Sequence, residues 1–454
     1  MWPRLFALAH PAAPLLTGYA DDGCPVDCGP PWSPKHILLS LRQGPHKSAL
    51  TSEARIVLHK ETAVKEAQGY AKVVRWRDIK QNLPPNLKIS PVACIPHKSK
   101  PLRVIIDLSF QLKVDKLSFP SVNDTTTKLA PAEAMVQLGL SLKRLISIMA
   151  KHYDKNLPFR FAKLDIKDGF WRLVVNEADA WHFAYVLPPK VKSNIDLDDT
   201  QLVIPTSLQM GWCESPPFFC ASSETARDVI QTLLDNNTSL PPHPYEHYMM
   251  GATPSPLPST ASTAPPARSV DIIEVFVDDF IGATNTQMDS HKLHLSRAML
   301  HGIHTIYPPP AITKHSGEDP IANKKLREKD GLWLHVKEIL GWIFDGEAYT
   351  IALPEDKCDR ILKQIKKGIK MPGNSPQTLP RTAGKIAACL LWHSRRLRVI
   401  LSPTNGPQRH TCVYLGHSTP TYNPGRLAGD HTAHAAPPNP NPPPHPHPGK
   451  FHRL

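Results

Sequence analysis

Apolar residues recur with two different periods along this chain, and together the two periods predict an α+β fold. Residues 131–153 carry leucine, isoleucine and methionine at helical spacing, and residues 216–235 open with prolines and continue with an apolar helical face. In contrast, residues 91–96 and 102–108 are rich in β-branched side chains and are separated by the basic turn 97–100. We therefore expect helices packed against antiparallel strands.

Three further stretches predict strands joined by turns. Residues 159–175 read as a strand, a turn and a second strand. Residues 274–284, EVFVDDFIGAT, read as a hairpin with two aspartates near its turn. Residues 336–354 read as another hairpin, which turns at Asp345 and Gly346.

Three more helices are expected, over residues 51–83, 354–370 and 379–396. The second of these separates an apolar face from a basic face, which consists of Lys357, Arg360, Lys363, Lys366, Lys367 and Lys370. Such a face can follow the backbone of a nucleic acid duplex through contacts that do not depend on base sequence.

Proline is concentrated in three parts of the chain. The 454 residues include 49 prolines, about twice the usual ~5%. They gather in residues 1–50, 237–270 and 401–454, which show little periodicity. We expect these parts to be an irregular N-terminal segment, a low-complexity surface insertion and a disordered Pro/His-rich tail.

The formal net charge of +13 favours an acidic partner, which could be nucleic acid or a membrane surface. No apolar run approaches the ~18–20 residues that a membrane-spanning helix needs, so we expect no membrane span. The eight cysteines are scattered, with no second pair at zinc-site spacing. This usage indicates a reducing, intracellular environment, either cytoplasm or nucleus.

The adjacent carboxyl groups of Asp278 and Asp279 are the strongest candidates for chemistry. Five apolar residues flank them, and like charges in a buried strand are unfavourable unless a cation or a turn compensates them. Asp165 ends another β-type run, so two neighbouring strands would bring three carboxylates together. Hard oxygen ligands of this kind suit two Mg²⁺ ions, with Mn²⁺ as an alternative. A site with two such ions performs phosphoryl transfer.

With these residues in view, the chain resembles the reverse transcriptases. Five segments resemble motifs of that family in the family's order: a fingers segment at 91–110, a first catalytic motif at 163–173, a segment before the palm helix at 210–219, an Asp–Asp box at 276–280 and a primer-grip hairpin at 338–346. The resemblance spans residues 50–400. Its type is the polymerase of an LTR retrotransposon or a related retroelement pol polyprotein.

The resemblance implies template-directed DNA synthesis from deoxynucleoside triphosphates (dNTPs), on an RNA or DNA template with a DNA primer. It assigns catalysis and Mg²⁺ binding to Asp165, Asp278 and Asp279. It assigns nucleotide contacts to five residues, namely Lys98, Arg103, Phe170, Gln209 and Gly211. Phe170 would exclude a 2′-hydroxyl from the site.

Two further assignments concern the primer. The resemblance implies that Leu340 and Gly341 help to hold the primer end. Lys337 is one candidate for the basic residue that the family places between the Asp–Asp box and the primer grip.

The fold implied is a right-hand polymerase of α+β class, with fingers, an antiparallel palm sheet and a partial thumb. The implied division of the chain is an irregular segment at 1–50, fingers at 51–160, a palm at 161–350 with an insertion at 237–270, thumb and connection helices at 351–400, and a disordered tail at 401–454.

Two alternative functions stay open on the sequence alone. No pattern typical of ribonuclease H follows residue 400, and protease-like and integrase-like patterns are not visible. The chain could therefore be a decayed copy that binds nucleic acid without catalysis. An RNA-directed RNA polymerase is the second alternative, and Phe170 argues against it because such enzymes usually place a polar acidic residue near this position.

Overall fold

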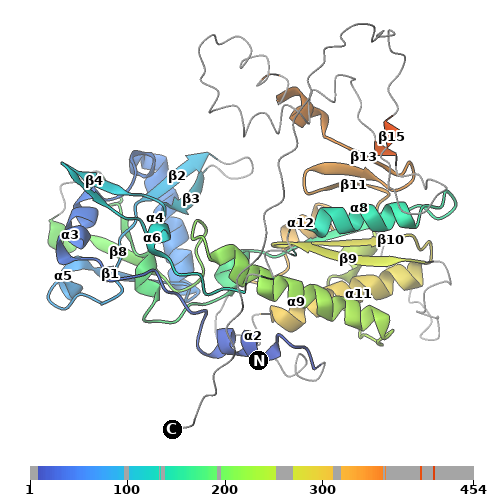
Figure 1. The fold of residues 1–454 in the computed structure, drawn as a ribbon, viewed down its shortest axis with the longest axis horizontal. Helices are drawn as coiled ribbons and strands as arrows, with labels where there is room; N and C mark the ends of the chain where they lie inside the picture. Colours follow the sequence, from blue (N-terminus) through green and yellow to red (C-terminus); the bar gives the residue numbers. More distant parts are fainter. Residues whose placement is uncertain are drawn as a thin grey trace, which may run out of the picture. The chain divides into compact units, whose positions relative to one another are not determined.

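Helices and antiparallel strands alternate along the chain (Figure 1). The structure is a computed structural model that describes residues 9–96, 102–131, 133, 137, 139–191, 196–251, 269–309, 318–360 and 363, and the backbone of 399–400 and 413–414. All described residues belong to one compact unit, Met1–Tyr414. The α+β class expected from the sequence is confirmed.

The predicted aspartates lie on a three-stranded antiparallel sheet, which we call the aspartate sheet. Its strands are β6 (Arg160–Asp165), β10 (Asp279–Thr284) and β9 (Asp271–Phe276), in that order across the sheet. β9 and β10 form the hairpin expected from EVFVDDFIGAT, because Phe276 pairs with Asp279 and leaves a two-residue turn between them. The sheet therefore ends at the Asp–Asp pair.

Both faces of the aspartate sheet are covered, because successive side chains of a strand point to opposite faces. On one face, Phe161 and Ile281 belong to the same apolar cluster as Leu145 of helix α8 (Ser141–Lys151). On the other, Leu164 and Phe280 share a cluster with residues of helices α9 (Ser215–Asp235) and α11 (Asp289–Ile306). Figure 1 shows α8 on one side of the sheet and α9 and α11 on the other.

A second sheet occupies the N-terminal half of the chain. Strands β1 (Ala71–Arg75), β8 (Gln201–Pro205) and β7 (Tyr185–Leu187) pair in the order β1-β8-β7, beside helix α4 (Ser52–Ala67). The same half contains two hairpins and five short helices: β2 (Val92–Pro96) with β3 (Leu102–Ile106), β4 (Leu112–Val114) with β5 (Leu117–Phe119), α5 (Trp76–Ile79), α6 (Val122–Thr125), η2 (Gly169–Arg172), η3 (Ala180–Phe183) and η4 (Leu197–Asp199). The β2–β3 pair is the hairpin predicted around the basic turn.

A third sheet follows the aspartate sheet. It begins with β11 (Val336–Ile339), β12 (Trp342–Asp345) and β13 (Thr350–Ala352), and continues with β14 (Val399–Ile400) and β15 (Val413–Tyr414). The hairpin expected at residues 336–354, with its turn at Asp345 and Gly346, is present, because β12 pairs with β13 up to Asp345 and Thr350 and the turn follows Asp345. In this turn, Asp345 Oδ1 accepts the backbone N–H groups of Glu347 and Ala348. A tighter turn at Leu340–Gly341, which joins β11 to β12, is an addition to the expected hairpin.

The expectation of an irregular segment at 1–50 is wrong from residue 9 onward. Helices α2 (Ala13–Asp21), α3 (Pro34–Gln43) and η1 (Lys47–Leu50) occupy much of it. Ser33 accepts the His36 N–H at the start of α3, and a proline at the first helical position has a φ already suited to a helix. Proline therefore begins these helices rather than breaking them.

Three other expectations need correction or fall partly outside the described residues. The helix expected at 51–83 ends at Ala67, where the chain passes into β1, and the second strand expected within 159–175 is replaced by the 3₁₀ helix η2. The helix expected at 354–370 is described as helical over 355–360 and at 363. Residues 379–396, and the 401–454 tail except for the backbone of β15, lie outside the described residues.

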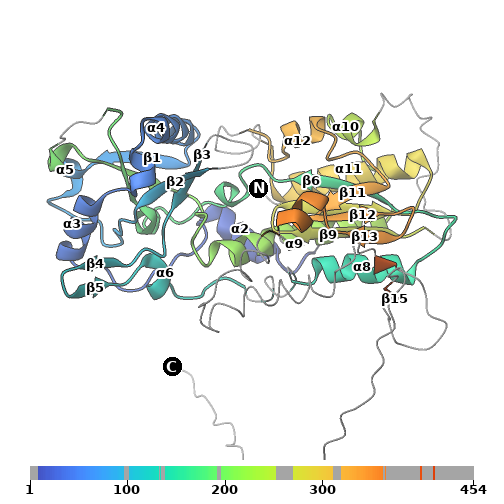
Figure 2. The same ribbon diagram turned by 90° about the horizontal axis from the view of Figure 1, so that it is seen from above.

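The insertion expected at 237–270 is described at both its ends. Residues 237–251 include helix α10 (Glu246–Met250), which packs on α11, while 252–268 lie outside the described part. Helix α12 (Asn323–Arg327) lies beside α10, as Figure 2 shows. Within the described residues, no helix combines the length and apolar character needed to cross a membrane.

Candidate active site around three aspartates

Strand pairing brings the three predicted aspartates to one end of the aspartate sheet. Asp279 lies directly opposite Asp165 in the β10–β6 register, and Asp278 precedes it in the turn. The Ile166 N–H donates to the Asp278 carbonyl at 3.0 Å. Residues directly opposite on antiparallel strands are about 5 Å apart at Cα, so residues over one hundred positions apart in sequence become neighbours.

The turn that carries Asp278 has an unusual backbone. Val277 has φ +57°, and a β-branched residue is rarely found in this left-handed region. Asp278 does not share the positive φ, so the pattern is that of a type II′ turn, whose first central position normally holds glycine. The Val277 side chain packs against Cys220 and Ala221 of α9. Such backbone strain persists only where its surroundings hold it, and it is concentrated at functional sites.

Burial and mutual repulsion change the acidity of these carboxyl groups. Burial raises the pKa of Asp165 to about 6, with further increases from Asp278 and Asp279 and a partly opposing effect of Lys325. Burial also raises the pKa of Asp278, followed by repulsion from Asp279, while Lys325 and Arg103 act in the opposite direction. The site therefore favours cations close to its carboxylates.

Lys325 supplies such a cation, and sequence reasoning missed it. Its Nζ lies 2.5 Å from Asp165 Oδ1. Lys325 lies on α12, and the segment before α12 runs beside the end of β6. There the Ala322 N–H donates to the Asp165 carbonyl at 2.9 Å, and Ile321 forms an antiparallel bridge with Ile166. These contacts place Lys325 next to Asp165. No local sequence pattern marks this contact.

Lys337, the candidate proposed from the sequence, is placed differently. Its side chain is buried, and its Nζ donates to the backbone carbonyls of Lys329 and Asp330. Burial lowers its pKa to about 8. Of the two lysines, Lys325 is the one with a direct contact to an aspartate of the site.

The donor set suits a hard divalent cation, although its side chains are not gathered around a common point. Three carboxylates supply only oxygen, the ligand that Mg²⁺ prefers. Across the described residues, however, no group of three or more His, Cys, Asp or Glu side chains is close enough to hold a metal ion. One of the two Asp165 carboxylate oxygens, Oδ1, is in contact with Lys325 Nζ, so Mg²⁺ at this carboxylate would have to compete with the ammonium group.

Arg103 and Gly211, two of the residues assigned to nucleotide binding, lie near one another. Arg103 on β3 contacts the sulfur of Met210 and is close enough to Asp278 to influence its pKa. Gly211 has φ +103°, and a Cβ at this position would lie 3.0 Å from the Ile106 carbonyl of β3. Glycine is therefore required here for both its conformation and its close contact with the β2–β3 hairpin.

Phe170 lies on the 3₁₀ helix that follows Asp165. Its ring meets the ring of Phe219 edge to face, with centroids 5.4 Å apart. A Cβ on the preceding Gly169 would lie 3.0 Å from Phe219 and 3.4 Å from the Cβ of Asp278. Gly169, next to Phe170, therefore allows this part of the chain to lie close to the turn that carries Asp278.

The remaining predicted residues differ in their relation to the site. Gln209 is buried, and its amide donates to the carbonyls of Ser207 and Leu208, so it is engaged with its own loop. Leu340 and Gly341 form the β11–β12 turn, and the Gly341 carbonyl accepts Lys357 Nζ at 3.0 Å. Lys98 lies outside the described residues.

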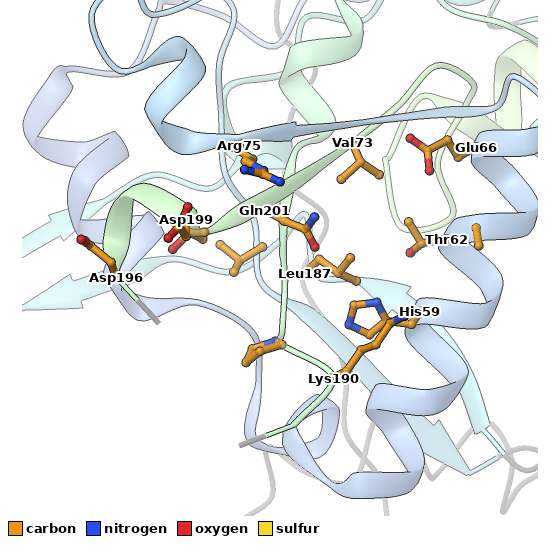
Figure 3. Close-up of a pocket in the computed structure, with 14 residues that line it drawn as sticks. His59, Thr62, Glu66, Val73, Arg75, Leu187, Lys190, Asp196, Asp199 and Gln201 are labelled. Carbon is orange, nitrogen blue, oxygen red and sulfur yellow. The ribbon is translucent and has the colours of Figure 1, made fainter. Parts of the chain in front are cut away.

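A separate cavity of about 800 Å³ lies between α4 and the β1-β8-β7 sheet (Figure 3). Its wall includes the charged groups of Glu66, Arg75, Lys190 and Asp199. Both signs of charge are present, so electrostatics favours no class of ligand. None of the residues that the sequence assigned to catalysis, nucleotide binding or primer gripping lines this cavity.

Comparison with known proteins gives a distant structural likeness. No family model and no curated protein matches the chain. Two solved structures of foamy viral protease-reverse transcriptase with double-stranded DNA are similar to it at 14% identity, with TM-scores of 0.41 and 0.40. Each covers 76% of this chain, which spans only 44% and 48% of theirs. Because the likeness is this distant, we base function on the geometry of the site.

Proposed function

We propose that the chain is the polymerase region of a retroelement reverse transcriptase, which extends a DNA primer with dNTPs on an RNA template. The observation that carries the proposal is the register that sets Asp279 opposite Asp165, with Asp278 in the adjoining turn. Motifs recognised independently in the sequence meet at one end of one sheet. A structural role alone does not require three carboxylates at this point, where they repel each other.

In this proposal, Asp165, Asp278 and Asp279 hold two Mg²⁺ ions. When bound, the ions would lower the pKa of the primer 3′-hydroxyl and stabilise the charge of the triphosphate. Arg103 is suited to phosphate oxygens because its guanidinium forms a planar fork. Lys325 keeps a positive charge next to Asp165 and would offset part of the negative charge of the triphosphate.

The remaining assignments follow the same scheme. Residues 51–160 would form the fingers, 161–350 the palm and the helix from 355 the start of the thumb. Leu340 and Gly341 would support the primer end, and the positive net charge would favour binding of the template–primer duplex. Lys98 would join Arg103 at the triphosphate.

Primer extension tests the proposal directly. The purified chain is supplied with poly(rA)–oligo(dT), Mg²⁺ and dTTP, next to an Asp278→Asn, Asp279→Asn variant. We expect extension by the parent and none by the variant. Extension that is equal in both proteins would refute the catalytic assignment.

A catalytically inert nucleic-acid-binding protein is the second candidate. The contact of Lys325 with Asp165 favours it, since a carboxylate already neutralised by lysine is a weaker metal ligand. In that case the folded parent would bind the duplex in a salt-dependent manner but would not extend the primer.

The assignment of Phe170 is tested by nucleotide choice. We expect Phe170→Ala to raise incorporation of ribonucleotides relative to deoxynucleotides by about 10-fold, since removing a ring from a pocket changes discrimination by about 1–3 kcal/mol. Trp171→Ala is the neighbouring control. An unchanged ratio in Phe170→Ala would show that the ring serves packing against Phe219 only.

A further inference from the structure

The first part of the insertion, residues 237–251, packs against helix α11 and the residues near Trp333. Arg297 on α11 donates two hydrogen bonds to the carboxylate of Glu246 on α10, from Nε at 2.7 Å and from Nη2 at 3.0 Å. The Met249 side chain is fully buried, and its carbonyl lies 3.4 Å from the Trp333 N–H. Residues 237–251 are thus part of the packed body.

A chain of hydrogen bonds runs from this docked segment to the segment that carries Lys325. The Tyr245 N–H donates to His243 Nδ1 at 3.1 Å. His243 Nε2 lies 3.1 Å from His304 Nδ1, and His304 Nε2 lies 3.1 Å from Asp319 Oδ1.

Only one arrangement of protons satisfies this chain with neutral imidazoles. Because His243 Nδ1 accepts a backbone N–H, its proton must be on Nε2, which then donates to His304 Nδ1. The His304 proton must be on Nε2 and is donated to the Asp319 carboxylate. The direction of every bond is therefore fixed, and the burial of His243 keeps it neutral by lowering its pKa to about 3.

A second contact links the same two segments. Asn323 Nδ2 donates to the Tyr245 hydroxyl at 3.0 Å, two positions before Lys325. We call His243, Tyr245, His304, Asp319 and Asn323 the insertion brace. It joins residues in the first part of the insertion to residues far beyond the insertion.

Residues 318–325, the segment that leads to Lys325, are also held by the residues that follow strand β6. Lys167 N–H donates to the Pro320 carbonyl at 2.7 Å, and Arg172 donates to the carbonyls of Glu318 and Asp319 at 2.7 and 3.1 Å. Residues 318–325 therefore lie between the Asp165 motif and the docked insertion.

We propose that the insertion brace positions Lys325 on Asp165. Its members are positioning residues, since they act on the site only through the backbone of residues 318–325. The catalytic meaning of this placement rests on the proposed polymerase function, but the placement itself does not. The insertion thus has a structural task in the site that it interrupts.

Chemical labelling of Lys325 tests the placement without any activity. The folded full-length chain is treated briefly with acetic anhydride, and acetylation of individual lysines is measured by mass spectrometry. The Lys325 side chain is about half exposed, so its ion pair with Asp165, rather than burial, is what slows its acetylation. We expect His243→Ala to increase the labelling rate of Lys325 several-fold and to leave that of Lys324, which does not contact the aspartates, unchanged. His247→Ala, on exposed α10 surface, is the matched control and should change neither.

A conservative replacement separates positioning from general stability. The amide of His243→Gln can still donate toward His304 Nδ1, so it should restore protection of Lys325 in part. If His243→Ala does not fold, Tyr245→Phe removes only the hydroxyl that meets Asn323 and should give a smaller increase. A lower melting temperature with unchanged Lys325 labelling in a folded brace variant would overturn the proposal.

Primer extension then connects the brace to the reaction. In an active parent, we expect His243→Ala to lower kcat more than it raises KM for dTTP, because Arg103 is left in place. An inactive parent whose Lys325 is deprotected by His243→Ala would refute the polymerase function and retain the brace. An active parent whose variant keeps both Lys325 labelling and kcat unchanged would refute the brace alone.

Discussion

Two hairpins of this chain have turns of equal length but opposite character. The β9–β10 turn, Val277–Asp278, has a positive φ at its first position only, where it places a β-branched residue. The β11–β12 turn, Leu340–Gly341, has positive φ at both positions, +49° and +84°, as in a type I′ turn, and uses glycine at the second. The residues of the first turn therefore suit its backbone conformation poorly, and those of the second suit theirs better.

The charges around the two turns also differ: those at the first turn are unfavourable and those at the second are favourable. Three mutually repelling aspartates meet at the first turn, whereas at the second Lys357 joins the Glu338 carboxylate and the Gly341 carbonyl. A turn selected only for stability would resemble the second. The contrast supports the proposal that the first turn is retained for its carboxylates.

The largest expected effect comes from removing charge at the first turn. We expect Asp278→Asn to lower primer extension by about 100-fold or more, the loss that several kcal/mol of metal-dependent stabilisation would cause. The same variant should be at least as stable as the parent, because it removes a carboxylate from a repelling group. Activity is measured by primer extension and stability by urea unfolding.

A loss of both activity and stability in Asp278→Asn would contradict this comparison. It would mean that the Asp278 carboxylate serves mainly to hold the turn, as Asp345 does in the later turn. The control is Asp345→Ala, which removes the oxygen that accepts two backbone N–H groups and should reduce stability while leaving the proposed nucleotide site intact.

The second turn is expected to show the reverse pattern. Gly341→Ala places a Cβ at φ +84°, where L-residues are strained, and 2.7 Å from Lys357 Nζ. Lys357 can move away, so strain is the main cost, and we expect a loss of about 1–2 kcal/mol in the free energy of unfolding. Urea unfolding measures it.

Gly18 is a matched control for this substitution. It lies within helix α2 and a Cβ there would meet nothing within 4 Å. Gly18→Ala should raise stability by about 0.5–1 kcal/mol because alanine favours the helix. Equal losses in Gly18→Ala and Gly341→Ala would show that the conformation of the turn is not the cause.

The parts of the site that were predictable from sequence are those with a local pattern. EVFVDDFIGAT alternates apolar strand residues around two aspartates, and α9 begins with prolines before a clear apolar face, so both elements were expected. The Asp345–Gly346 pair, a strong hairpin signal, marked the β12–β13 turn correctly, whereas the tighter turn at Leu340–Gly341 carries no such signal at its first position. The two turns lie only five residues apart in the sequence.

Lys325 could not be found in the same way. Its place depends on the Ala322–Asp165 backbone bond and on the His243–His304–Asp319 chain, which join residues far apart in the sequence. The stretch around it contains several charged residues with no periodicity that distinguishes one lysine from the next. Lys337 was the nearer candidate to the primer-grip motif, but its side chain is turned to local carbonyls.

The smallest expected effect concerns the helix beneath the first turn. Burial raises the pKa of Glu224 on α9 to about 7, with partial compensation by Arg227 and Arg144. The folded state therefore holds this proton more tightly than the unfolded chain, whose glutamate pKa is about 4.3. Between these two values the unfolded state binds fewer protons, so stability falls as pH rises.

We expect this fall to be on the order of 1–2 kcal/mol between pH 5 and pH 7. Glu224→Gln should reduce the fall and leave the part due to Asp165, whose raised pKa of about 6 lies in the same range, whereas Asp235→Asn at the exposed end of the same helix should not reduce it. Urea unfolding at the two pH values measures the difference. If Glu224→Gln keeps the parent's pH dependence, the Glu224 charge is fully balanced by its neighbouring arginines, as the Glu338 charge near the β11–β12 turn is by Lys357. The difference between the two turns would then come from the aspartates alone.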